Sequence, residues 1–147
     1  MNIPVCVLPH GLGLELPSYQ TEGSAGMDIR AAIEEPLVLA TLQRVAVPTA
    51  LTMAIPQGYE GQVRPRSGLA FRHGLSIINA PGTIDSDFRG EIKILLINLG
   101  RQDITINRGM RIAQLIIAPV IQAKLNVVTT LVSSNRGSSG FGSTGVE

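Results

Sequence analysis

Short aliphatic runs separated by glycine and proline constrain the fold of this chain more than any other feature of its sequence. Runs rich in Val, Ile and Leu recur along the chain, and none keeps a helical spacing of apolar residues for long. The segment DITIN alternates apolar and polar residues, as a half-buried strand does, whereas EIKILLIN and IAQLIIAPV are nearly continuous, as strands buried on both faces are. We expect strands at residues 37–39, 44–47, 49–55, 61–63, 75–79, 91–98, 104–106, 111–120 and 127–131.

One segment, SGLAFRHG at residues 67–74, has the features of a helix. Ser67 is placed to cap its start, and Gly74 is placed to end it in the left-handed conformation. The sequence therefore predicts an all-β fold, a sandwich, jelly roll or distorted barrel of many short strands with one short helix. Because aromatic residues make up only 3% of the chain, we expect an aliphatic core. We divide the chain into a body, residues 1–132, and a flexible, Gly/Ser-rich C-terminal arm, residues 133–147.

The composition indicates a single globular domain with few charges. The chain has 147 residues, of which 44% are apolar and 16% are charged. So few charges favour a surface that partner subunits cover in part. The net charge of +1 provides no overall field that would attract nucleic acid or a membrane, so any anion site must be local.

The small number of cysteines and histidines and the absence of long apolar runs argue against disulfide-linked, zinc-binding and membrane-spanning proteins. The single cysteine, Cys6, excludes an intrachain disulfide and is expected to be a small buried hydrophobe. With only two histidines besides, His10 and His73, a zinc cluster is not expected. The first residues lack the basic segment of a signal peptide, and no apolar run reaches the roughly 18 residues of a membrane span. We therefore expect a cytoplasmic protein.

The arm ends in RGSSGFGSTG, residues 136–145, which holds one arginine and one phenylalanine. Glycine amides and serine hydroxyls suit phosphate oxygens, the arginine can bind an anion, and the phenylalanine can stack on a flat ring. Ordering such residues costs about 1–2 kcal/mol each, so closure of a lid needs several charge-assisted hydrogen bonds. A solvated linker is the alternative, and the residues alone leave both open.

Two further segments combine small residues with charge. RPRSGLA, residues 64–70, can form a phosphate cradle from a guanidinium, a serine hydroxyl and backbone amides, although a plain helix cap with solvated arginines is the simpler interpretation. AGMDIRA, residues 25–31, contains one aspartate, Asp28, that can hold a metal-bound water or order a loop, and taken alone the loop is favoured.

The segment INAPGTIDSDFRGEI, residues 78–92, predicts a β-hairpin that turns at Pro81-Gly82. Asp85 is equally compatible with a general base for a water and with a turn residue that caps backbone amides. We expect Asp87 and Glu91 to be solvated or paired with Arg89. Further along, GMRIAQLI places Gln114 in an apolar run, where a buried amide must find a hydrogen-bond partner.

Taken in order, AGMDIRA, RPRSGLA, GTIDSDFRGEI, GMRIAQ and RGSSGFGSTG resemble the five motifs of the trimeric dUTP pyrophosphatases (dUTPases), from Ala25 to Gly145. The resemblance implies a jelly-roll homotrimer with three active sites at subunit interfaces. It also implies hydrolysis of dUTP to dUMP and pyrophosphate, which limits uracil incorporation into DNA and supplies dUMP for dTMP synthesis. Mg²⁺, held mainly by the triphosphate, is the implied cofactor.

The resemblance assigns a role to each matching residue. Asp85 matches the aspartate that activates the water attacking the α-phosphorus, and Asp28 matches the one linked to Mg²⁺ through water. The implied contacts to phosphate or the attacking water are Arg66, Ser67, Gly68 and Gln114. The implied contacts to uracil, largely through the main chain, are Asn79, Thr83, Ile84 and Lys93. In the arm, Phe141 matches the ring that stacks on uracil, and the residues implied to hold the β and γ phosphates are Arg136, Gly142, Ser143 and Thr144.

Three positions depart from the family pattern. Phe88 stands where the family usually has Tyr, and its ring can still pack on deoxyribose and exclude a 2′-hydroxyl. Met110 replaces a usual acidic residue, and we expect it to affect local pairing rather than chemistry. Ser139 replaces a usual glycine, and we expect it to slow or loosen closure of the lid slightly.

Three other functions compete with the one that this resemblance implies. A dCTP deaminase, or a bifunctional enzyme, needs a carboxylate at the base edge, and the segment 78–92 has no convincing spare glutamate. A non-enzymatic trimer that binds another protein would be favoured by loss of Asp85, Arg66 or the arm, and all are present. A nucleic-acid-binding barrel is disfavoured by the near-zero net charge and the shortage of aromatic residues.

Overall fold

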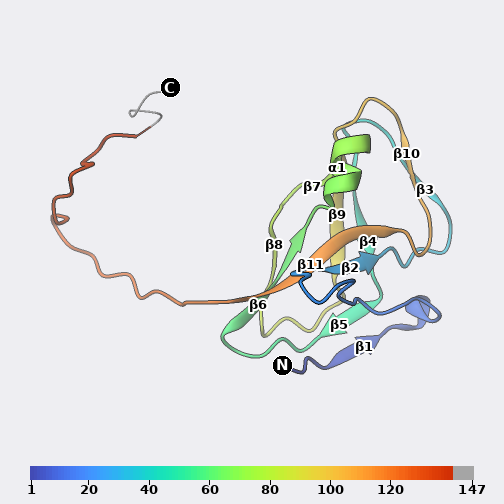
Figure 1. Cartoon of the computed structure of the whole chain (residues 1–147), viewed down its shortest axis with the longest axis horizontal. Helices are drawn as coiled ribbons and strands as arrows, with labels where there is room; N and C mark the ends of the chain where they lie inside the picture. Colours follow the sequence, from blue (N-terminus) through green and yellow to red (C-terminus); the bar gives the residue numbers. More distant parts are fainter. Residues whose placement is uncertain (141–147) are drawn as a thin grey trace.

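The computed structural model describes residues 1–140 and confirms the all-β prediction (Figure 1). Within these residues lie eleven strands, one short 3-10 helix, η1 (Pro9–Gly11), and one α-helix, α1 (Ser67–His73). The strands are β1 (Val5–Val7), β2 (Met27–Arg30), β3 (Leu37–Leu39), β4 (Arg44–Pro48), β5 (Leu51–Met53), β6 (Tyr59–Arg64), β7 (Leu75–Ile77), β8 (Gly82–Ile84), β9 (Lys93–Asn98), β10 (Ile104–Ile106) and β11 (Arg111–Pro119).

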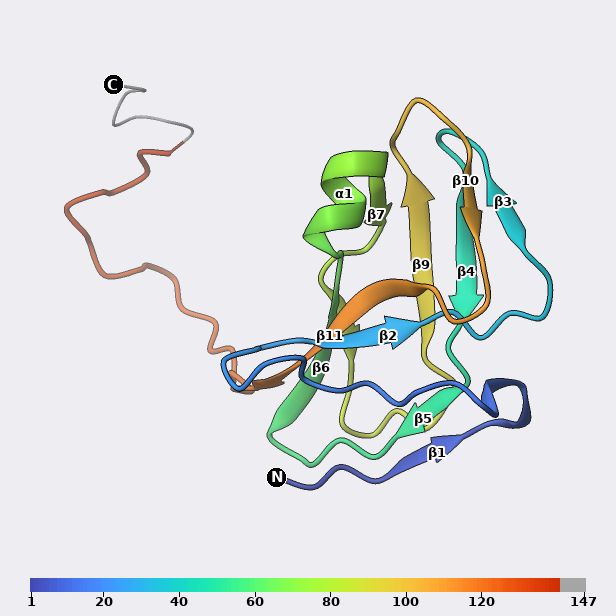
Figure 2. The ribbon, with the colours of Figure 1, turned by 45° about the vertical axis from the view of Figure 1, so that its right-hand side comes forward.

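The strands form four antiparallel sheets in a jelly-roll-like arrangement. The largest sheet has the order β2-β11-β6-β8, and a second has the order β4-β9-β7. Two pairs, β1-β5 and β10-β3, complete the body. Figure 2 shows β11 running between β2 and β6, with α1 following the end of β6. This long central strand fixes the relative positions of three sequence-distant segments.

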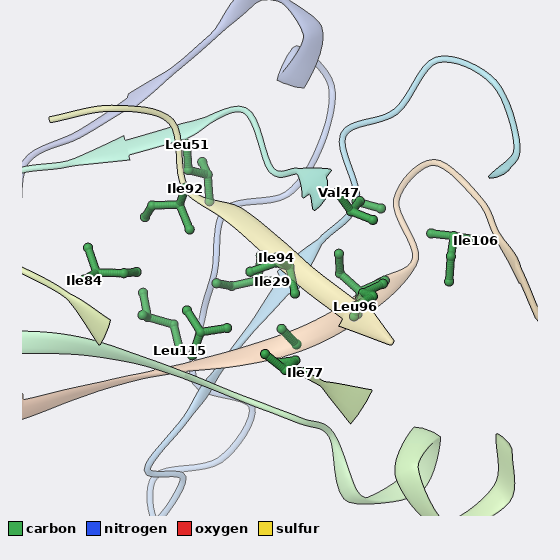
Figure 3. Close-up of a cluster of buried hydrophobic side chains, with 14 of the residues drawn as sticks. Ile29, Val47, Leu51, Ile77, Ile84, Ile92, Ile94, Leu96, Ile106 and Leu115 are labelled. Carbon is green, nitrogen blue, oxygen red and sulfur yellow. The ribbon is translucent and has the colours of Figure 1, made fainter. Parts of the chain in front are cut away.

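The core is aliphatic, as the composition predicted. Figure 3 shows Ile94 and Leu96 of β9 facing Ile29 of β2 and Leu115 of β11, and all four side chains are fully buried. The buried polar side chain of Asn98 is satisfied, because Nδ2 donates to the carbonyls of Leu39 (2.9 Å) and Gln102 (2.8 Å). Burial of branched aliphatic side chains, worth about 1.5–3 kcal/mol each, therefore holds the sheets together.

The predicted helix forms, but Ser67 is not its cap. Arg66 is the N-cap, its side chain makes no capping hydrogen bond, and Ser67 is the first helical residue. Gly74 ends the helix with a φ of 69°, as predicted, and its amide donates to the carbonyl of Ala70. No residue of α1 is fully buried, and Leu69 is its one side chain that packs against the core.

Several strand predictions were wrong in informative ways. β9 alternates, with Ile94 and Leu96 buried and Leu95 38% exposed, so its continuous apolar run is buried on one face only. The expected strand 49–55 is shorter because Ala50 has a φ of 57°, which breaks the extended conformation between β4 and β5. Strands β1, β2 and β8 were not among the predicted strands. Cys6 is exposed rather than buried, because β1 pairs with β5 alone.

The segment 78–92 is not a β-hairpin. Its first flanking strand, β7, pairs with β9, whereas β8 pairs with β6, so the chain crosses here from one sheet to another. The expected strand 127–131 is also absent, and residues 120–140 contain no helix or strand. In Figure 1 they run away from the sheets. No helix within residues 1–140 is long and apolar enough to cross a membrane.

Candidate active site

A polar cleft lies beside the start of α1 and the outer face of the largest sheet. We call it the charged cleft, and its volume is about 450 Å³. Gln114 of β11 lies opposite Asp28 of β2 on one side and opposite Arg64 of β6 on the other. The neighbouring residues Ile29, Leu115 and Val63 point into the core. The residues that line the cleft are Asp28, Arg66, Ser67, Gly68, Leu69, Arg72, His73, Arg111 and Gln114.

Two arginines hold the carboxylate of Asp28. Arg66 donates from Nε to Oδ1 at 2.8 Å, and Arg111 donates from Nη1 to Oδ2 at 3.0 Å. Arg66 also donates from Nη1 to the backbone carbonyl of Arg111 at 3.1 Å. The side chain of Asp28 is only 17% exposed, so this network compensates the cost of removing its charge from water. Asp28 and Arg66, which lie far apart in the sequence, thus form one unit.

Gln114 has the hydrogen bond that its place in an apolar strand required. Its Nε2 donates to the carbonyl of Pro65 at 2.9 Å, which fixes the orientation of the amide. A Cβ at Gly26 would lie 2.5 Å from Oε1 of Gln114, so glycine is needed at this position for the amide to sit as it does. The sequences around Asp28, Arg66 and Gln114 are therefore packed against one another in the charged cleft.

A second depression follows β8 and the segment after it. We call it the apolar cleft, and its volume is about 270 Å³. β8 is the edge strand of its sheet within the described residues, so the side of its backbone that faces away from β6 is free of strand partners. The residues that line the cleft are Val63, Ile77, Asn79, Gly82, Thr83, Ile84, Asp85, Phe88, Glu91, Ile92, Lys93 and Leu95.

Phe88 lies over a glycine at one side of the apolar cleft. Its ring is placed so that a Cβ at Gly90 would lie 2.7 Å from Cζ. The ring is 44% exposed, and the amide of Phe88 donates to the carbonyl of Asp85 at 3.1 Å. The same turn therefore connects the exposed ring with the exposed carboxylate of Asp85.

Glu91 anchors the far end of this turn. Its Oε1 accepts hydrogen bonds from Nε2 of His10 (2.6 Å) and from the amide of Ala50 (2.8 Å). Burial acts to raise the pKa of Glu91, but the hydrogen bonds from His10 and Ala50 and the positive charges of His10 and Lys93 lower the pKa below its ordinary value. The predicted pairing of Glu91 with Arg89 is wrong, because Arg89 donates instead to the carbonyls of Ser86 and Phe88. Asp87 is exposed, as expected.

The predicted site residues thus form two groups within the body. Asp28, Arg66, Ser67, Gly68 and Gln114 line the charged cleft. Asn79, Thr83, Ile84, Asp85, Phe88 and Lys93 line the apolar cleft. The two clefts share no lining residue.

No described residue of the arm lines either cleft. Arg136 donates from Nε to the carbonyl of Ser139 at 2.9 Å, within the arm itself. The predicted contacts Phe141, Gly142, Ser143 and Thr144 lie outside the described residues.

Sequence reasoning missed two arginines of the charged cleft. Arg111 lies within the segment GMRIAQ and follows Met110, which packs against the core. Arg72 lies in the last turn of α1. The sequence signal for Arg111 was its place three residues before Gln114. The register of β11 against β2 shifts between Arg111 and Ala113, and the guanidinium of Arg111 reaches Asp28.

Comparisons with known proteins identify the family of the chain. The dUTPase family model matches residues 13–145. A deoxyuridine 5'-triphosphate nucleotidohydrolase of Rhizobium etli is 57% identical over 141 residues, which cover 95% of this chain and 90% of that protein. A Brucella melitensis protein of the same name is 59% identical over 140 residues, covering 94% and 89%. The dUTPase of Staphylococcus bacteriophage 80alpha, solved with dUPNHPP, has a TM-score of 0.88 at 28% identity and covers 99% of both chains.

These matches define the protein as an enzyme of the nucleotide hydrolase class. The family model spans well over half of the chain, and the curated relatives exceed half identity over nearly all of it. The chain therefore belongs to the dUTPase family.

Proposed function

We propose that this protein hydrolyses dUTP to dUMP and pyrophosphate, in a homotrimer whose active sites combine the two clefts of different subunits. The observation that carries the proposal is the assembly of Asp28, Arg66, Ser67, Gly68 and Gln114 in one cleft of the folded chain. These residues come from three segments of the sequence, and they are the ones that the family pattern assigns to the triphosphate and its metal.

The charged cleft suits a polyphosphate. Its lining includes three guanidiniums, the hydroxyl of Ser67 and the amide of Gln114, and only one carboxylate, Asp28. Guanidiniums bind phosphate oxygens in bidentate geometry, and phosphoryl transfer depends mainly on positioning and charge stabilisation. Ser67 and Gly68 would hold the α and β phosphates, and Gln114 would lie near the attacking water.

The apolar cleft suits a pyrimidine nucleoside. The free edge of β8, at Thr83 and Ile84, offers backbone donors and acceptors of the kind that distinguish uracil from cytosine. A slot lined by backbone leaves no space for the methyl group of thymine. Phe88 provides a flat ring against which deoxyribose can pack, so that a 2′-hydroxyl is excluded. Asn79 and Lys93 lie at the same cleft and complete the contacts to the base.

Asp85 is the general base of the proposed reaction. Its exposed carboxylate follows β8 directly and lines the apolar cleft, beside the position of the nucleoside. There it accepts the proton of a water molecule whose oxygen attacks the α-phosphorus, and pyrophosphate leaves. General-base catalysis of this kind typically contributes about 10²–10⁴ in rate.

The donor set of the charged cleft fits Mg²⁺ that arrives with the substrate. Mg²⁺ usually keeps several waters and binds substrate phosphates with one or two carboxylates. Asp28 is the only carboxylate that lines this cleft, and no group of three or more His, Cys, Asp or Glu side chains that could hold a metal lies within residues 1–140. When bound, Mg²⁺ would neutralise charge on the triphosphate, while Asp28 accepts a hydrogen bond from one of its waters. A mutant dUTPase from phage phi11 of S. aureus is described with a structural Mg(II) ion.

The exposed segment before the arm, residues 120–132, supports the trimer. Ile121, Leu125, Val127 and Val132 are each more than 90% exposed in the single chain. Such an apolar segment, extending away from the sheets, is accounted for if it packs on a second copy of the chain. The arm would then deliver Arg136, Phe141, Gly142, Ser143 and Thr144 to a site on a neighbouring subunit, where Phe141 stacks on uracil. A cytoplasmic enzyme that limits uracil in DNA and supplies dUMP for dTMP synthesis is the corresponding cellular role.

The test is pyrophosphate release with Mg²⁺ from dUTP, dTTP, dCTP and UTP, measured for the full chain and for a chain ending at Asn135. We expect release from dUTP alone and near-complete loss in the shortened chain. Absence of release from dUTP would overturn the proposed activity, and ammonia release from dCTP would favour the deaminase alternative. If the shortened chain still releases pyrophosphate, the proposed activity stands, but the proposed role of the arm in substrate binding is wrong. Sedimentation of both chains reports whether the trimer forms.

A further inference from the structure

Arg72 occupies a position in the charged cleft that the family pattern does not assign. It is in the last turn of α1 and lines the cleft together with Gly68, one helical turn earlier. Its Nη2 lies 3.8 Å from where a Cβ of Gly68 would be, so the guanidinium folds back over the glycine. Arg72 is exposed, and its head group is therefore available to a ligand in the cleft.

The charges of the cleft are not balanced, and the excess is at Arg72. The lining has three guanidiniums and one carboxylate. Two of the three, Arg66 and Arg111, are bound to that carboxylate, Asp28. None of the ion pairs within residues 1–140 includes Arg72. Arg72 is thus the guanidinium of this cleft whose charge no described side chain compensates.

We infer that Arg72 is a substrate-binding residue that contacts the phosphate chain, and specifically the part that leaves as pyrophosphate. This inference rests on the proposed function. Arg66 already holds Asp28, whereas Arg72 can bind phosphate oxygens without breaking an existing ion pair. Negative charge develops on the leaving pyrophosphate during the reaction, and a cation beside it lowers the barrier.

A purely structural role for Arg72 makes different predictions. A basic side chain in the last turn stabilises a helix through the helix dipole, and lysine does this as well as arginine. A phosphate contact uses the planar fork of the guanidinium, which lysine reproduces only as a point charge. Binding of inorganic pyrophosphate separates the two roles, because it reports on the phosphate subsite without the nucleoside.

The experiment compares Arg72→Gln and Arg72→Lys with the full-length wild type and with Arg44→Gln, an exposed arginine on β4 that lines neither cleft. Calorimetry measures binding of inorganic pyrophosphate and of dUMP with Mg²⁺, and steady-state kinetics give kcat and KM for dUTP. We expect Arg72→Gln to weaken pyrophosphate binding and to raise KM about tenfold, Arg72→Lys to lie between, and dUMP binding and Arg44→Gln to be unchanged.

Pyrophosphate binding and KM within twofold of the wild type in Arg72→Gln would overturn the inference. So would full recovery in Arg72→Lys together with a lowered Tm of Arg72→Gln, since that pattern belongs to a helix-stabilising role. If the wild type does not hydrolyse dUTP, the proposed function fails. The pyrophosphate titrations still test Arg72 in that case, because they require no turnover.

Discussion

The charged cleft lies on the outer face of the regular sheet β2-β11-β6-β8, whereas the apolar cleft follows the irregular segment 78–92 that crosses between two sheets. In the first, strand register places Asp28 opposite Gln114, and charged and polar side chains line the cleft. In the second, a free strand edge and a turn expose backbone groups and one ring. The sheet thus fixes charged side chains by its register, while the crossing segment shapes the apolar cleft that we propose for the base.

This difference predicts that mutations in the two clefts affect different steps. Changes in the charged cleft are expected to alter the affinity for phosphates and the rate for every nucleotide alike. Changes in the apolar cleft are expected to alter the choice between nucleotides. Asp85 is the exception, because it lines the apolar cleft but, in the proposed reaction, acts on the phosphorus held by the charged one.

The largest effect is expected for Asp85→Asn. The amide keeps the size of the side chain but cannot accept the proton of the attacking water, so kcat should fall about 10²–10⁴-fold. Because Asp85 is exposed, Tm and dUMP affinity should stay as in the wild type. Single-turnover kinetics with dUTP measure the chemical step directly. A rate within threefold of the wild type would remove Asp85 from its role as base.

A smaller effect is expected for Gly26→Ala in the charged cleft. The new Cβ would lie 2.5 Å from Oε1 of Gln114, so the amide must move and its hydrogen bond to Pro65 must weaken. Loss of one such contact is worth about 1 kcal/mol, or roughly fivefold in kcat/KM. The ratio of kcat/KM for dUTP to that for UTP should not change. A changed ratio would mean that the charged cleft also affects the choice between nucleotides, contrary to the difference that we predict between the two clefts.

The matched change in the apolar cleft is Gly90→Ala. Its Cβ would lie 2.7 Å from Cζ of Phe88, and the exposed ring can swing aside at little cost in stability. If the ring excludes the 2′-hydroxyl, the ratio of kcat/KM for dUTP to that for UTP should fall about three- to tenfold. Competition assays with the two nucleotides measure this ratio. An unchanged ratio, with the ring shown to be displaced, would leave sugar selectivity to other residues.

Much of this organisation follows from local sequence patterns, and the remainder depends on long-range pairing. The helix over 67–73 and its end at Gly74 were predictable, because a left-handed glycine ends a helix through contacts within a few residues. The crossing of segment 78–92 was not, since β7 and β8 are three residues each and their partners, β9 and β6, are chosen by the whole fold. The candidate site residues were proposed from the resemblance to the dUTPases, and their separation into two clefts came only from the structure.

The interaction between Asp28 and Arg111 is a single contact that the sequence alone could not predict. Each residue lies in a segment that the sequence singled out, but nothing local indicates that they meet. The irregular register of β11 against β2, between Arg111 and Ala113, brings the guanidinium to the carboxylate. The pairing of Glu91 with His10 is similar, because 81 residues separate the two in the sequence. Contacts of this kind are properties of the assembled sheets.

The smallest effect is expected for Glu91→Gln, which tests whether the apolar cleft is held in place by charge. Glutamine can still accept from the amide of Ala50, but it lacks the negative charge that His10 and Lys93 face. A charge-assisted hydrogen bond exceeds a neutral one by about 1 kcal/mol, so the variant should lose about this much free energy of unfolding at neutral pH. Matched urea titrations at equal chain concentration measure it.

The pH dependence of this difference follows from the direction of the shift. The pKa of Glu91 in the folded protein lies below its ordinary value of 4.5. The carboxylate therefore stabilises the fold fully above that ordinary value, and its contribution is lost as the pH falls through the folded pKa. Wild type and Glu91→Gln should accordingly differ at neutral pH and converge in acid. Equal free energies of unfolding at neutral pH would show that the hydrogen bond from the amide of Ala50, which both side chains can accept, and not the charge, anchors the turn that carries Phe88 and Asp85.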